Sequence, residues 1–125
     1  MQMLLSIALG GAVGAIARHL LSARIMNMLG STFPYGTLVV NVLGSFIMGF
    51  LIIILATRLN ISQEMRAFIV VGVLGGFTTF STFSLETALL IERGNILEAA
   101  IYIGSSVVVS IGALFIGLWL GRILA

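Results

Sequence analysis

Cysteine, aspartate and lysine are absent from this sequence, and only 8% of its 125 residues are charged. Without cysteine, the chain forms neither disulfides nor thiolate metal sites. A typical soluble domain carries about a quarter charged residues, whereas this chain is 60% hydrophobic with a mean hydropathy of +1.25. The composition therefore excludes an ordinary soluble domain and indicates a membrane protein.

Titratable side chains are too few and too scattered for catalysis. The single histidine, His19, has no carboxylate or second histidine at metal-ligand spacing, and no nucleophile, base and orienting residue occur together. The six arginines form no basic run of the kind that binds nucleic acid. We therefore expect neither an enzyme nor a nucleic-acid-binding protein.

Apolar stretches long enough to cross a bilayer of about 30 Å recur along the chain. Because lipid satisfies no backbone polar group, we expect them to be helices, within a single transmembrane domain spanning 1–125. The first stretch lacks the basic segment of a cleaved signal peptide, so we expect it to be retained. The predicted spans are approximately 3–26, 37–56, 67–91 and 97–121.

Two of the links between these spans end in a helix-start pattern. Asn60 is followed by Gln63, and Asn95 by Glu98, an N-cap with an acceptor side chain three residues later. We expect the third and fourth helices to begin after these asparagines.

The arginines are almost evenly shared between the two membrane faces. An even number of crossings places Arg58, Arg66 and Arg122 on the face of the N-terminus, and Arg24 and Arg93 on the other, with Arg18 in or near the end of the first helix. The positive charge that normally fixes orientation is therefore nearly balanced. We expect dual topology, the same chain inserting both ways up; a fixed topology set by weak signals is the alternative.

Small residues spaced four apart supply surfaces for close helix contact. The matching sets are Gly10/Gly14, Gly11/Ala15, Gly72/Gly76 and Ala113/Gly117/Gly121. These contacts fit packing within one subunit as well as packing between two. Together with the charge balance, they favour an antiparallel homodimer. Four helices alone close on themselves, so we expect a transport path to use the interface between subunits.

The segment "GVLGGFTTFSTFSLE", residues 72–86, is unusually polar for a membrane span. Gly75 and Gly76 are a candidate helix break, because each glycine costs about 1 kcal/mol relative to alanine. Phenylalanines at every third position are expected to form one slowly rotating stripe. Five hydroxyls follow the glycines: Thr78, Thr79, Ser81, Thr82 and Ser84.

Each of these hydroxyls has an ordinary alternative, a bond to the carbonyl one turn back, and a phenylalanine stripe is more often packing. A break, hydroxyls, aromatic rings and Glu86 within one segment are nevertheless costly at bilayer depth, and such cost marks a pathway. Ring edges are positive, Asn41 adds a donor in the second span, and no acidic ring favours cations. These features favour an anion without naming it.

Three motifs resemble the Fluc family of bacterial fluoride channels. They are "GGAVGAIAR" at 10–18, "GTLVVNVLGSF" at 36–46 and "GGFTTFSTFS" at 75–84. The resemblance covers nearly the whole chain and implies a dual-topology homodimer with two antiparallel pores in the bacterial inner membrane. It implies passive fluoride export that lowers cytoplasmic fluoride toxicity.

The resemblance also implies roles for individual residues. Phe80 and Phe83 match the pore phenylalanines whose ring edges face fluoride, and Asn41 matches the pore donor. Gly75 and Thr78 match the positions whose backbone carbonyls, from both subunits, hold a structural sodium ion. Polar positions along the route are matched by Ser81, Thr82, Tyr102, Ser106 and Ser110.

Two further residues, Glu86 and Arg18, each keep two interpretations, and Thr37 has one. Glu86, near one pore end by analogy, either accepts a hydrogen bond or exchanges rotamers with the ion. Arg18 either concentrates anions in a vestibule or extends to the lipid headgroups, and Thr37 adds a vestibule hydroxyl.

Three rival functions remain. A small multidrug-exporter pump needs a carboxylate deep in its chamber, commonly in the first helix, and the first span here has no acid. A proton-coupled fluoride exchanger needs a coupling group that the sequence does not reveal. A purely structural partner would leave the hydroxyls without a purpose.

Overall fold

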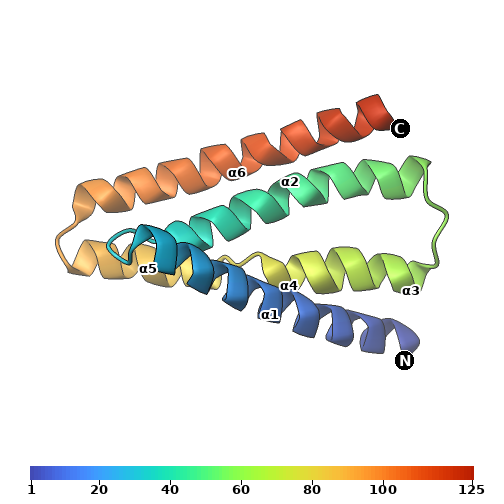
Figure 1. Cartoon of the computed structure of the whole chain (residues 1–125), viewed down its shortest axis with the longest axis horizontal. Helices are drawn as coiled ribbons and strands as arrows, with labels where there is room; N and C mark the ends of the chain where they lie inside the picture. The colour runs from blue at the N-terminus through green and yellow to red at the C-terminus, as the bar shows by residue number, and fades with distance from the viewer.

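Helices form almost the entire chain in the computed structural model, which describes residues 1–125 (Figure 1). The first two are α1 (Gln2–Leu29) and α2 (Tyr35–Thr57), and the last is α6 (Ile96–Leu124). The third span, Gln63–Glu92, consists of α3 (Gln63–Arg66), the π-helical η1 (Ala67–Leu74), α4 (Gly75–Phe77) and α5 (Ser81–Glu92).

All four predicted spans are confirmed as helices long and apolar enough to cross a membrane. Each extends beyond its predicted range by one to four residues, because backbone hydrogen bonding continues past the apolar stretch. The links turn at Gly30 and Gly94, whose φ values of 89° and 83° suit glycine. Both termini lie at the end of the bundle where α3 begins (Figure 1).

The predicted helix starts are only partly correct. Ser62, not Asn60, caps the third span, and its Oγ accepts a hydrogen bond from the Met65 amide at 3.1 Å. Both residues are good caps two positions apart, so the loop geometry decides between them. Asn95 does stand at the N-cap of α6, but its side chain makes no capping bond.

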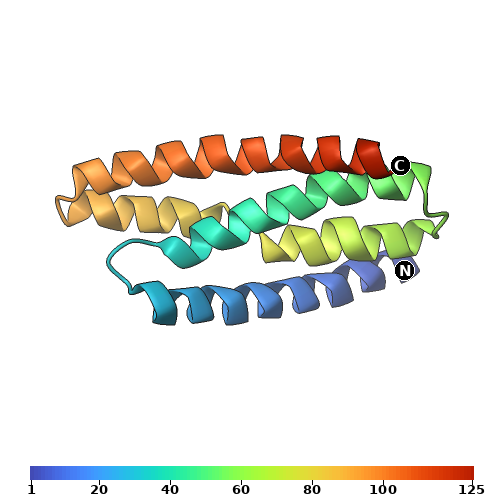
Figure 2. The same cartoon turned by 45° about the horizontal axis from the view of Figure 1, so that its top comes forward.

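The third span is interrupted at Thr78–Phe80, and not at the predicted glycine pair (Figure 2). Gly75 and Gly76 are helical, whereas Thr78 is extended with φ −87° and ψ 158°. The glycine-break prediction is wrong because a glycine permits a break without requiring one. The same interruption also disrupts the predicted phenylalanine stripe, since it divides Phe77 from Phe83.

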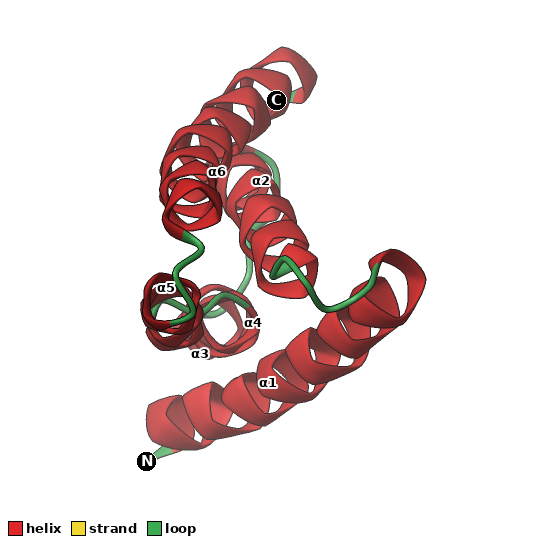
Figure 3. Ribbon diagram, turned by 90° about the vertical axis from the view of Figure 1, so that its left-hand side faces the viewer, coloured by secondary structure: helices red, strands yellow, loops and turns green.

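The small residues pack helices together within one chain. α1 lies against η1 and α4, while α2 lies against α6; the end-on view shows these pairs (Figure 3). A Cβ on Gly76 would lie 2.8 Å from the Gly11 carbonyl oxygen, and one on Gly117 would lie 2.8 Å from the Phe50 amide. Backbones this close admit no side chain, so glycine at these positions sets the distances between helices.

Replacing Gly72 by alanine should destabilise the protein. Its Cβ would stand 2.7 Å from the Gly10 Cα, a backbone atom that cannot rotate away. We expect a loss of about 1–3 kcal/mol, typical of overpacking, seen as a lower midpoint of thermal unfolding in detergent. Gly104→Ala is the control, because no atom lies within 4 Å of a Cβ there. Equal midpoints for the two variants would contradict the packing argument.

Candidate functional site

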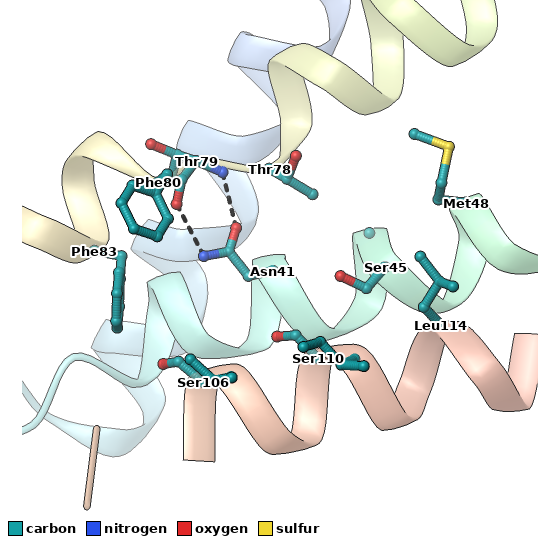
Figure 4. Close-up of a pocket in the computed structure, with 13 residues that line it drawn as sticks. Asn41, Ser45, Met48, Thr78, Thr79, Phe80, Phe83, Ser106, Ser110 and Leu114 are labelled. Carbon is teal, nitrogen blue, oxygen red and sulfur yellow. Dashed lines mark hydrogen bonds between the residues drawn. The ribbon is translucent and has the colours of Figure 1, made fainter. Parts of the chain in front are cut away.

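A groove of about 420 Å³ lies where α2, α6 and the interruption of the third span meet (Figure 4). Its wall is mostly apolar, with hydroxyl and amide groups at intervals, and none of its lining residues is charged. The interruption contributes Thr78 and Thr79. Six of the predicted site residues line it: Asn41, Thr78, Phe80, Phe83, Ser106 and Ser110.

Two hydrogen bonds join α2 to the interrupted segment. The Asn41 side-chain Nδ2 donates to the Thr79 carbonyl at 2.9 Å, and the Thr79 amide donates to Asn41 Oδ1 at 2.8 Å (Figure 4). Asn41 thus pairs with the extended backbone as a neighbouring strand would. One of its two N–H donors remains for another partner.

The two predicted pore phenylalanines lie together at the groove. Their ring centroids are 5.4 Å apart with planes inclined by 53°. Phe83 is buried and contacts the ring of Tyr102 with centroids 5.1 Å apart, whereas Phe80 is 77% exposed. The Phe80 ring therefore lies on a face of the subunit that no other part of the chain covers.

Ser106 carries an unpaired polar atom at this groove. Its side chain is only 7% exposed, and its hydroxyl makes no hydrogen bond. Other hydroxyls follow the ordinary alternative: those of Thr78, Ser84 and Thr87 each donate to the carbonyl one turn back. A buried hydroxyl without a partner is costly, so Ser106 is available to a ligand in the groove.

A second hollow, of about 300 Å³, gathers predicted vestibule residues. The predicted vestibule residues Arg18 and Thr37 line it, together with Thr82 of the predicted route and with His19 and Ser22 of α1. The Arg18 Nε donates to the Gly76 carbonyl at 3.1 Å. Arg18 is therefore tied to the third span beside the interruption, and its two interpretations both stay predictions.

Glu86 and Tyr102 form a pair beside the groove rather than within it. The Tyr102 hydroxyl donates to Glu86 Oε1 at 3.0 Å, and Tyr102 is fully buried among Phe83, Leu90 and Ala99. Glu86 accepts a hydrogen bond, as one of its two predicted roles requires. Ser81, the remaining predicted position, is exposed, with its hydroxyl 3.5 Å from that of Thr79.

The predicted cation ligands have free oxygens. The Gly75 and Thr78 carbonyls accept no hydrogen bond within the chain, while those of Gly76 and Thr79 do. No cluster of three or more His, Cys, Asp or Glu side chains could hold a metal. Hard cations prefer oxygen ligands, so free carbonyls are the donor set that fits such an ion here.

Thr79 is the functional candidate that the sequence did not distinguish. It was one of five hydroxyls in a row, and only the position of the interruption decides which of them turns toward α2. Thr79 bonds with both its backbone groups and its hydroxyl. Ser45 and Met48 also line the groove without having been predicted.

An interrupted membrane helix beside an uncharged groove with hydroxyl and amide groups at intervals is the architecture of a small membrane channel or transporter subunit. Residues 5–118 match the family described as CrcB-like protein, Camphor Resistance (CrcB). The chain therefore belongs to the CrcB-like family and is a multi-pass membrane protein.

Curated relatives extend over almost the full length of the chain. The fluoride-specific ion channel FluC of Agrobacterium fabrum is 54% identical over 93% of both chains. The protein of the same name from Rhodospirillum centenum is 51% identical over 98% of this chain and 97% of its own length. That of Chelativorans sp. is 52% identical over 98% of each. The family is one of ion channels, which confirms that the protein is not an enzyme.

Replacing Asn41 by leucine, which is similar in size, should loosen the interrupted segment. The change deletes both bonds to Thr79 and leaves two backbone groups unpaired, which costs about 1–3 kcal/mol for each group. The expected result is a lower thermal midpoint and faster hydrogen exchange at residues 78–82. Ser45→Ala, in the same groove, removes a hydroxyl with no bond in the chain and serves as control. Unchanged exchange in Asn41→Leu would refute the positioning role.

Proposed function

We propose that this protein is a fluoride channel of the bacterial cell membrane. The observation that carries the proposal is the unpaired, buried Ser106 hydroxyl in a groove that also holds an amide donor and two phenyl rings. The relatives named as fluoride-specific channels, at about 50% identity over nearly the whole chain, support the choice of ion.

The chemistry of the groove suits a small anion. Hydroxyl and amide N–H groups replace part of the hydration that the ion loses, and phenyl ring edges are positive. No carboxylate lines the groove to attract cations. Because Arg18 and Thr37 line a separate hollow close to the interruption, we propose that hollow as the vestibule that concentrates anions.

An antiparallel homodimer would cover the open side of the groove. Phe80 is 77% exposed in the single chain, and burial of a phenyl ring favours association. In this assembly Phe80 of one subunit and Phe83 of the other flank each of two pores. The near-even sharing of arginines between the two faces supports insertion in both orientations.

A sodium ion at the centre of such a dimer would be held by the Gly75 and Thr78 carbonyls of both subunits. The support is that these oxygens accept no hydrogen bond in the chain. A bound cation satisfies carbonyls that a helix break frees at membrane depth. The ion is structural in this proposal and is not transported.

Transport needs no coupled energy source. A membrane potential of 100 mV is worth about 2.3 kcal/mol for one charge, enough to drive fluoride outward through a passive pore. A multidrug-type pump would need an acid in the first helix, and α1 has none. A proton-coupled exchanger would move fluoride without a potassium ionophore, which the experiment below distinguishes.

The direct test is fluoride efflux from liposomes that contain the purified protein, followed with a fluoride electrode. A selective channel should release fluoride rapidly only when a potassium ionophore carries the compensating charge, and should retain chloride in parallel vesicles. Release without the ionophore would instead indicate an exchanger. Intact protein that releases no fluoride under either condition would refute transport of this ion.

Replacing Phe80 or Phe83 by isoleucine should reduce fluoride efflux to near background while the protein still assembles. Isoleucine keeps an apolar side chain but removes the positive ring edge. Efflux in the same liposomes measures the effect, and size-exclusion chromatography verifies assembly. Trp119→Ile, on the exposed face of α6, is the matched control. Parental rates in both pore variants would exclude a ring-edge role.

A further inference from the structure

The interrupted third span diverts two backbone donors from the carbonyls that they would meet in a continuous helix. The Thr79 amide would donate to the Gly75 carbonyl four residues back. It donates instead to Asn41 Oδ1 at 2.8 Å. The Gly75 carbonyl is thereby left without a partner.

The second diversion depends on the Thr79 side chain. In a continuous helix, the Thr82 amide would donate to the Thr78 carbonyl. It donates instead to Thr79 Oγ1 at 3.3 Å, and that hydroxyl donates to Thr82 Oγ1 at 3.2 Å. The Thr78 carbonyl is the second oxygen left free.

One carbonyl next to each of these two oxygens is engaged by a side chain. Arg18 Nε occupies the Gly76 carbonyl, and Asn41 Nδ2 occupies that of Thr79. The Gly75 and Thr78 carbonyl oxygens stay available, and each lies next to a carbonyl that accepts a hydrogen bond from a side chain. The Arg18 cation also disfavours a second cation at Gly76.

We propose that Thr79 is a positioning residue for the cation site, and that it acts with Asn41 to keep the Gly75 and Thr78 carbonyls available for sodium. The inference rests on the sodium ion of the proposed function and adds the side chains that select its ligands. The Thr79 hydroxyl does this by accepting a hydrogen bond from the Thr82 amide, which would otherwise compete with the ion for the Thr78 oxygen.

Thr79→Val tests this role because valine keeps the shape and removes the hydroxyl. Thermal unfolding and dimer content of the purified protein are measured over a series of sodium concentrations, with N-methylglucamine replacing sodium. Without the hydroxyl, the Thr82 amide competes with sodium for the Thr78 carbonyl. The free energy of that competition is about the net contribution of one hydrogen bond. We expect the sodium concentration giving half of the stabilisation to rise about fivefold.

Two further variants separate positioning from plain helix stabilisation. Thr79→Ser restores a hydroxyl and should return the sodium midpoint to the parental value. Thr87→Val removes a hydroxyl that bonds only to the Phe83 carbonyl, within α5, and should leave the midpoint unchanged. If Thr79 merely capped α5, Thr79→Val would lower stability equally at every sodium concentration.

An unchanged sodium midpoint in Thr79→Val would overturn the inference, and so would a parent protein indifferent to sodium. Thr79→Val could fail to assemble in low sodium. Recovery of the dimer at high sodium then supports the inference. Failure at every sodium concentration, together with a parental sodium midpoint for Thr79→Ala, overturns it. Fluoride efflux by the parent is measured separately, so a failure of the channel proposal is distinct from a failure of this one.

Discussion

The reciprocal pair of hydrogen bonds between Asn41 and the Thr79 backbone is the interaction on which the rest of the site depends. A membrane helix can be interrupted only if other groups satisfy its freed N–H and C=O groups. Asn41 of α2 supplies both a donor and an acceptor for the Thr79 backbone. The chain can therefore leave the helix for three residues while these two backbone groups keep hydrogen-bond partners. The extended backbone brings Phe80 to the groove, and α5 then resumes with Phe83 facing the same space.

Glycine contacts provide the frame that holds these bonds in place. Gly72 and Gly76 let η1 and α4 lie directly on α1, and Gly49 and Gly117 do the same for α2 and α6. Between the two pairs, Gly44 of α2 lies against the Thr78 methyl group and the Phe77 ring, so α2 approaches the third span closely at the interruption. A side chain as short as that of Asn41 can then reach Thr79 reliably.

The sequence predicted the number of helices, their approximate bounds and a broken third span, because long apolar stretches and bilayer thickness leave few choices. Asn41 and the polar third span were singled out because polar groups are costly at that depth, whereas the resemblance implied the roles of Phe80, Phe83, Ser106 and Ser110. All of these residues line one groove. The sequence placed the break at Gly75 and Gly76, three residues too early, because the true position depends on which backbone groups Asn41 reaches from another helix. For the same reason, the sequence alone could not separate Thr79 from its neighbouring hydroxyls.

The interruption also divides the third span between two packing units. Its first half, η1 and α4, lies against α1, while its second half, α5, lies against α6. The three non-helical residues, Thr78–Phe80, therefore connect one packing unit to the other. A change in bilayer thickness tilts membrane helices, and a tilt of one unit relative to the other would bend the chain at these residues. Bilayer thickness would then act on the segment that places Thr78, Thr79 and Phe80 at the groove.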